Sequence, residues 1–185
     1  ALVESDSAYL TATNFAPPKK DDGQSGLQIA FKVGALDIAD YLIDAGADVN
    51  FMEESDINEW RTPVLIDCVY RTIGSCYLTQ RKHPENAEKV FNQALAILQT
   101  MLDKGADPNA KDSYENTVIG AGLSFVRQYT CQHPQFTGHD AFPNNDNPNL
   151  AYTKGFTDEE REYQLTQLRQ MFKLLIDAGA ELDTP

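Results

Sequence analysis

Residues 42–50 read LIDAGADVN, and two close copies follow, MLDKGADPN at 101–109 and LIDAGAELD at 175–183. Each copy has two apolar residues, an Asp, a spacer and then Gly-Ala before an acidic residue. A helix often ends in a left-handed residue, and glycine is the residue that takes this conformation without strain. The Asp-x-Asn that follows supplies side-chain acceptors for the next turn. The phrase therefore predicts three helix ends. The glycines predicted to have positive φ are Gly46, Gly105 and Gly179.

A helix start signal precedes each of these phrases. Ser25 opens the first unit, Thr62 followed by Pro63 opens the second, and Thr117 opens the third. A Ser or Thr hydroxyl caps the free N–H groups of a first helical turn, and proline suits the first helical position. The chain is therefore predicted to contain three helix–turn–helix units.

The stretch from Asp22 to Asn50 resembles an ankyrin repeat along its whole length. The resemblance implies an all-α solenoid of helix–turn–helix units joined by β-turn fingers. It also implies a concave face, built by inner helices and finger tips, with which this family mostly binds proteins. The residues that match the family pattern are Asp22, Gly23, Ser25, Leu27, Ala30, Gly34, Ile38, Leu42, Ile43, Gly46, Ala47, Asp48, Val49 and Asn50.

The second and third units are longer than the family allows. The family period is about 33 residues, whereas Gly46 and Gly105 are 59 residues apart and Gly105 and Gly179 are 74 apart. Apolar residues keep a helical spacing through much of the surplus, which indicates lengthened helices. Thr157 and Glu160 form a capping box at the start of the last one. The helices predicted for these units cover 63–79, 85–103, 118–129 and 158–178, the last with a packed stripe of Tyr163, Leu168, Met171, Phe172 and Leu175.

The whole chain, 1–185, is predicted to form a single domain. Its parts are an N-terminal cap segment (1–21), a first repeat (22–50), a second repeat with an insertion (51–109), and a third repeat (110–185) with a long loop at 133–156. The cap segment is expected to cover one end of the stack through Tyr9, Leu10 and Phe15.

Asp67 occupies a position where the family keeps a small alanine between stacked helices. A carboxylate there must find hydrogen-bond partners or disrupt the stack. Two interpretations stay open, looser stacking at this point or a polar site next to the insertion.

Composition narrows the functional classes. The net charge of −13 argues against nucleic acid and anionic membrane surfaces, and leaves room for a basic partner. No stretch of about 18 apolar residues exists that would span a bilayer. Three cysteines without a CxxC pair indicate reduced thiols and a cytoplasmic chain. Because the sequence begins with Ala1, a removed secretion signal stays open, and with it a secreted or periplasmic location.

Catalytic motifs are absent from the sequence, so neither an enzyme nor a cofactor is predicted. One cluster offers soft and imidazole ligands within ten residues, namely Cys131, His133, His139 and Asp140. Its spacing matches no structural zinc pattern, and a flexible loop would lose entropy on converging around a metal. Ordinary loop residues are the preferred interpretation.

The leading functional hypothesis is a non-catalytic module that binds a partner protein through its fingers and inner helices. The first finger, Phe51 to Arg61, lies between the first and second units and carries the only tryptophan; the second, Lys111 to Asn116, carries Tyr114. Trp, Tyr and Arg dominate interface energies. A second interpretation of Trp60 is that it folds back onto the helices and fills space. The residues predicted to bind the partner are Phe51, Met52, Trp60, Arg61, Lys111, Tyr114 and Asn116.

Two other hypotheses remain. The first is an acidic inhibitor or immunity-type protein that blocks a basic partner, whose association would weaken steeply with salt. The second is an enzyme or metal protein built on the loop 133–156.

Overall fold

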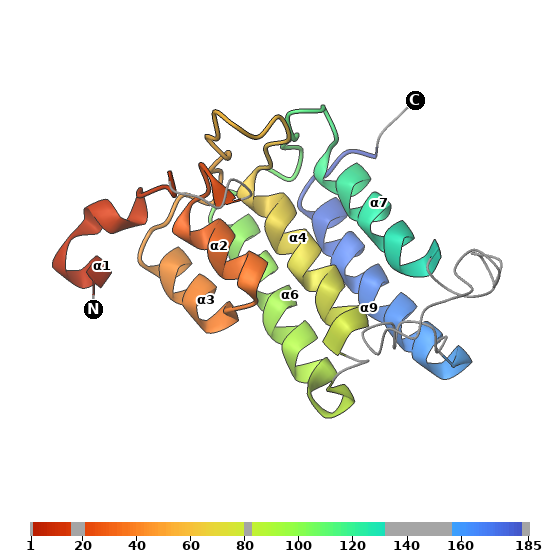
Figure 1. Cartoon of the computed structure of the whole chain (residues 1–185). Helices are drawn as coiled ribbons and strands as arrows, with labels where there is room; N and C mark the ends of the chain where they lie inside the picture. The colour runs from red at the N-terminus through yellow and green to blue at the C-terminus, as the bar shows by residue number, and fades with distance from the viewer. Residues whose placement is uncertain (1, 16–20, 80–82, 132–156, 183–185) are drawn as a thin grey trace, which may run out of the picture.

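A computed structural model describes residues 2–15, 21–79, 83–131 and 157–182. The described residues are mostly helical and contain isolated β-bridges but no β-strand. Figure 1 shows two layers of helices, with α2, α4 and α7 in one layer and α3, α6 and α9 in the other. The all-α prediction is confirmed. The bounds are α1 Leu2–Ser5, α2 Gly26–Val33, α3 Leu36–Asp44, α4 Val64–Gly74, α6 Ala87–Asp103, α7 Val118–Cys131 and α9 Asp158–Asp177.

The insertions are helical, as their apolar spacing predicts. Helix α4 continues as a π-helical turn over Ser75–Thr79 (η3), and a 3-10 turn over Pro84–Asn86 (η4) leads into α6. Helices α6, α7 and α9 begin and end within two residues of the predicted bounds. The first predicted range, 63–79, is also helical, but its last turn is the π turn and not a continuation of α4. No helix of the described chain has the length and apolar character that a membrane span requires.

The helix starts show why these segments fold locally. Ser25 and Gln28 form a capping box at α2, and Thr157 and Glu160 form another at α9. The hydroxyl of Thr117 accepts a hydrogen bond from the N–H of Gly120. Thr62 departs from the prediction, because Pro63 stands at the N-cap position of α4 and no side chain caps the start of this helix. The Thr62 hydroxyl donates to Oδ2 of Asp67 instead.

The helix ends confirm the glycine prediction. Gly46, Gly105 and Gly179 have φ values of 97°, 90° and 97°, and each directly follows the C-cap residue of its helix. The N–H of Asn50 donates to Oδ1 of Asp48, and Asn109 repeats the contact with Asp107, so the Asp-x-Asn turns form as expected.

The two asparagines also connect one turn to the next. The Asn50 side chain donates to the carbonyl of Gly105 at 2.9 Å and accepts from the N–H of Asp107 at 2.7 Å. Asn109 makes the equivalent pair of bonds with Gly179 and Glu181, at 3.0 and 2.7 Å. A row of asparagine bridges therefore holds the three glycine turns in register.

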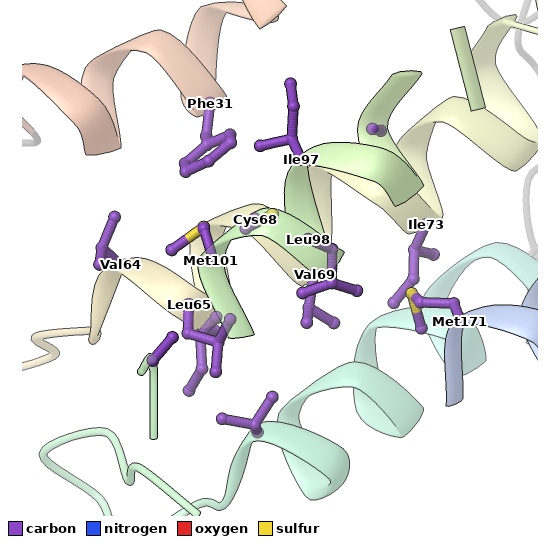
Figure 2. Packing of buried hydrophobic residues seen from close by; sticks show 14 of the residues in the cluster. Phe31, Val64, Leu65, Cys68, Val69, Ile73, Ile97, Leu98, Met101 and Met171 are labelled. Carbon is purple, nitrogen blue, oxygen red and sulfur yellow. The ribbon is translucent and has the colours of Figure 1, made fainter. Parts of the chain in front are cut away.

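One continuous core joins all three helix pairs, and α4 lies at its centre. Figure 2 shows Phe31 of α2, Leu98 and Met101 of α6 and Met171 of α9 around the buried face of α4. Gly122 of α7 leaves room for Val69 and Phe172, whose atoms would lie 3.2–3.4 Å from an added Cβ. The second helix pair is therefore packed between the other two.

The contacts expected of Tyr9, Phe15 and Tyr163 are wrong. Tyr9 and Phe15 of the cap segment are 50% and 72% exposed, and only Leu10 is half-buried. The segment is attached instead by backbone pairing of Asn14 with Gly23 and Gln24. Tyr163 is 36% exposed, because the buried stripe of α9 passes through Gln164 and Gln167, one residue further along the helix.

Candidate functional site

The first finger, residues 51–63, begins and ends in a β-bridge between Met52 and Pro63. Inside it, Ser55 is buried and its hydroxyl donates to Oδ2 of Asp22 at 2.8 Å. The same hydroxyl accepts from the N–H groups of Ile57 and Asn58, which fixes the turn. The finger is therefore held to the start of the first helix pair.

The second finger, residues 111–117, holds the tip of the first one. The indole Nε1 of Trp60 donates to Oδ2 of Asp112 at 2.8 Å. Ser113 donates its hydroxyl to the carbonyl of Glu59 and accepts from the N–H of Arg61. Trp60 is nevertheless 50% exposed. The ring is oriented by a hydrogen bond rather than by burial, so the alternative in which it folds back to fill space is wrong.

Asp112 is the anchor for this contact. It is 3% exposed, and besides Trp60 it accepts hydrogen bonds from Asn116 and from the N–H of Tyr114. Burial alone would raise the pKa of this carboxyl, but the hydrogen bonds from Asn116 and Trp60 outweigh it and lower the pKa overall. Asp112 therefore stays ionised and keeps the indole in place at neutral pH.

Asp67 finds the hydrogen-bond partners that a carboxylate between stacked helices requires; it is half-buried, whereas its neighbours Ile66 and Cys68 on α4 are fully buried. Its Oδ2 accepts from Nε2 of Gln28 at 2.8 Å and from the hydroxyl of Thr62 at 3.3 Å. Burial raises the pKa of the Asp67 carboxyl to about 7, and the charge of Glu53 adds to the rise. The hydrogen bonds and Lys32 lower it by less.

A cleft of about 680 Å³ opens beside Asp67, below the first finger. Phe31 and Lys32 of α2, one face of α4 and Phe125 of α7 form its walls, and the finger forms its rim. On α4 the lining residues follow an i, i+3, i+4, i+7 spacing, which places them on one helix face. They are Asp67, Tyr70, Arg71 and Gly74.

Aromatic rings and charges are mixed in this cleft. Tyr70 and Phe125 stack with ring centroids 4.3 Å apart and an interplanar angle of 27°. Trp60 and Ile57 line the rim. Burial and the nearby carboxylates of Asp112 and Asp67 raise the pKa of Tyr70 to about 12, so its hydroxyl stays neutral. The cleft therefore offers aromatic stacking surfaces together with carboxylates.

The predicted partner-binding residues are distributed over the two fingers. Met52, Trp60 and Tyr114 are 39%, 50% and 59% exposed, and Arg61 and Lys111 are exposed as well. Phe51 packs against the core and is half-buried, and the Asn116 amide is bonded to Asp112. Phe51 therefore belongs more to the framework of the finger than to its surface, whereas Asn116 is exposed in spite of its bond to Asp112.

The sequence indicated that Asp67 and Trp60 are unusual but did not predict that both line the same cleft. Sequence reasoning missed Glu53, Tyr70, Arg71 and Phe125. The helical spacing from Asp67 to Gly74 was a usable signal for Tyr70 and Arg71. Phe125 lies 58 positions from Asp67 in the sequence, and no local pattern connects the two.

Metal and thiol chemistry have little support in the described residues. Cys68 and Cys76 are buried free thiols; burial raises the pKa of both, that of Cys76 to about 12, so both stay protonated. No group of three or more candidate metal ligands occurs in the described part of the chain. His133, His139, Asp140 and the loop 133–156 lie outside the described residues, as does the side chain of Cys131.

Searches against protein-family models, curated proteins and solved structures found no match to this chain.

Proposed function

We propose that this chain is an ankyrin-type solenoid that binds a partner protein and carries out no catalysis. Support for the ankyrin type comes from three helix pairs with left-handed glycine turns and from fingers that pair at their bases through isolated β-bridges. The enlarged second and third units lengthen the helices and keep these turns. A stack of such units buries apolar faces pairwise, which matches the single core running through all three pairs.

One observation carries the functional proposal. The only tryptophan of the chain is half-exposed at the rim of a cleft, and a hydrogen bond to a buried Asp112 fixes its ring. Trp, Tyr and Arg provide most of the energy of protein interfaces, and a side chain fixed before binding loses less entropy on binding. Trp60, Arg61 and Tyr114 belong to these residue types and lie on adjacent fingers.

The test begins with affinity capture from extracts of the source cell and identification of the partner by mass spectrometry. The dissociation constant is then measured with purified partner for the wild type and for the variant Trp60→Ala/Tyr114→Ala. We expect the double variant to bind at least about tenfold more weakly. Tyr9→Ala is the matched control, because Tyr9 is also 50% exposed but lies in the N-terminal segment. An unchanged dissociation constant in the double variant would show that the fingers are structural, and the loop 133–156 would be tested next.

The net charge of −13 favours a second candidate, an acidic inhibitor that blocks a basic partner. Such a protein relies on long-range attraction, so its affinity falls steeply with ionic strength. The salt dependence of the same dissociation constant separates the two candidates.

A further inference from the structure

The cations that line the cleft are already engaged by the chain itself. Arg71 donates Nε to the carbonyl of Phe31 at 2.8 Å and Nη2 to the carbonyl of Lys32 at 3.0 Å. These carbonyls belong to the last turn of α2, where a positive charge is favourable. Lys32 is paired with Asp21 and also donates to Gln24. Both cations therefore hold the cleft together and are not directed at an anionic ligand.

Two of the acidic residues that line the cleft keep acceptor capacity. Both hydrogen bonds of Asp67 reach Oδ2, so Oδ1 accepts none from the described residues. The side chain of Glu59 forms neither an ion pair nor a hydrogen bond in the described part of the chain. Glu53, the third carboxylate, accepts from Gln24 and Asn58. The open polar groups of the cleft are therefore acceptors.

The apolar part of the lining is aromatic. The stacked pair of Tyr70 and Phe125 and the oriented indole of Trp60 border the same space as the carboxylates. Aromatic faces attract cations, and a planar guanidinium both stacks on a ring and donates hydrogen bonds to carboxylates. Lysine carries a compact, strongly hydrated charge that makes poorer use of stacking surfaces.

We propose that the cleft holds an arginine side chain of the partner protein, with its guanidinium donating to Asp67 and Glu59 and stacking on the aromatic lining. The charge of the chain agrees with this occupant, since a net charge of −13 attracts a segment that carries a cation. This inference rests on the proposed function and specifies which side chain of the partner the binding site recognises.

The ionisation of Asp67 supplies a signature for this site. Gln28 of α2 and Thr62 of the finger donate to the carboxyl, Glu53 of the finger repels its negative charge, and Lys32 of α2 attracts it. On α4 itself, Tyr70 and Cys68 feel the charge of Asp67, and both stay protonated. Because the pKa of Asp67 is about 7, the empty site is largely protonated at pH 6 and largely ionised at pH 8. Arginine binds the ionised form, so the apparent affinity rises about tenfold between these pH values.

The experiment uses the full chain and two small probes. Nα-acetyl-arginine-N-methylamide presents the guanidinium, and the matched citrulline compound replaces it with an uncharged urea group of the same shape. Fluorescence of Trp60 and the chemical shift of its indole N–H report occupancy, because the chain has one tryptophan and it lines the cleft. We expect saturable millimolar binding of the arginine probe, at least about tenfold stronger than that of the citrulline probe at pH 8.

Variants connect the signal to the site. In Asp67→Asn we expect the preference for arginine to fall about tenfold and the pH dependence to vanish. Asp40→Asn removes the same charge from an exposed position on the outer helix α3 and should behave as the wild type. Equal binding of the two probes, or an Asp67→Asn variant that keeps both the preference and the pH dependence, would overturn the proposal.

The failure of this inference is distinguishable from failure of the proposed function. If the captured partner binds Asp67→Asn as tightly as the wild type and an excess of the arginine probe does not displace it, the cleft inference falls while partner binding stands. If the double finger variant retains full affinity for the partner, the proposed function of the fingers falls, whatever the probes show.

Discussion

Asp67 shows how a single carboxyl with little access to water affects the stability of the fold. In the unfolded chain its pKa is the ordinary 3.8, and burial raises the folded value to about 7. The folded state therefore holds this proton more strongly, and its contribution to stability is full below pH 3.8 and is lost as pH rises toward 7. Above that pH a constant penalty remains.

Asp67→Asn removes this penalty while keeping an acceptor for Gln28 and Thr62. We expect the variant to gain stability over the wild type, with the gain larger at pH 8 than at pH 5.5 by about 2 kcal/mol. Thermal denaturation at the two pH values measures this, as a melting-temperature difference that grows by about 4–8 °C. A difference that stays constant with pH would mean that the Asp67 pKa is near its ordinary value in the folded chain.

Two glycines are constrained for different reasons, Gly46 by its backbone conformation alone and Gly23 also by a close neighbour. Nothing lies within 4 Å of a Cβ added at Gly46, so Gly46→Ala meets only the strain of a left-handed backbone. At Gly23 the added Cβ would lie 2.1 Å from the N atom of Ser55, in addition to a φ of 74°. We expect Gly46→Ala to cost about 1 kcal/mol and Gly23→Ala at least about twice as much.

Urea denaturation of the two glycine variants gives both free energies of unfolding. Asparagine tolerates left-handed backbone better than alanine, so Gly46→Asn is expected to recover part of the loss. Equal costs at the two positions would contradict the close approach of the first finger to Gly23.

At the scale of elements, the asparagine bridges join successive glycine turns. Asn50→Ala removes two hydrogen bonds to the second turn, and Asn109→Ala removes two to the third. Because these bonds are exposed, we expect each variant to lose about 1–2 kcal/mol. Hydrogen exchange should accelerate at the Asp107 amide in the first variant and at the Glu181 amide in the second.

Asn92→Ala is the control for these variants, because Asn92 is exposed in the middle of α6 and is expected to leave exchange at both amides unchanged. Faster exchange at both turns in either single variant would show that the turns open together and that the bridges do not act locally.

Most elements of this chain were predictable because their signals are local. Ser25 and Thr157 mark helix starts, and the three turn glycines mark helix ends, through chemistry within a few residues. The structure has helices that begin and end at these positions. The π turn at Ser75–Thr79 was not predictable, since its residues keep an apolar pattern compatible with an ordinary helix. The exposure of Tyr9 and Phe15 depends on packing that no local signal encodes.

At the scale of the whole molecule, the candidate site brings together residues that only the fold makes neighbours. Trp60 and Asp112 are 52 positions apart, and Gln28 and Asp67 are 39 apart. The sequence indicated that Asp67 was unusual and that Trp60 lay on a finger. It carried no information on the distance between them, because that distance depends on how one helix pair stacks on the next.

The acidity of the whole chain leads to a prediction about its partner. If a few short-range contacts dominate, affinity should fall by less than about tenfold between about 0.05 and 0.5 M salt, since contacts in a partly buried cleft are weakly screened. Surface plasmon resonance over this range of salt measures both the dissociation constant and the association rate. A much steeper fall, mainly in that rate, would favour the inhibitor hypothesis.

The central position of the second helix pair has a mechanical consequence. Helix α4 packs against both α2 and α7, so the second pair carries extensive contacts to both of its neighbours. Under tension applied along the stack, the outer pairs would each peel away from one neighbour, whereas the middle pair would have to break two interfaces. Pulled in an optical trap, the chain should therefore extend in more than one step, with the middle pair rupturing last.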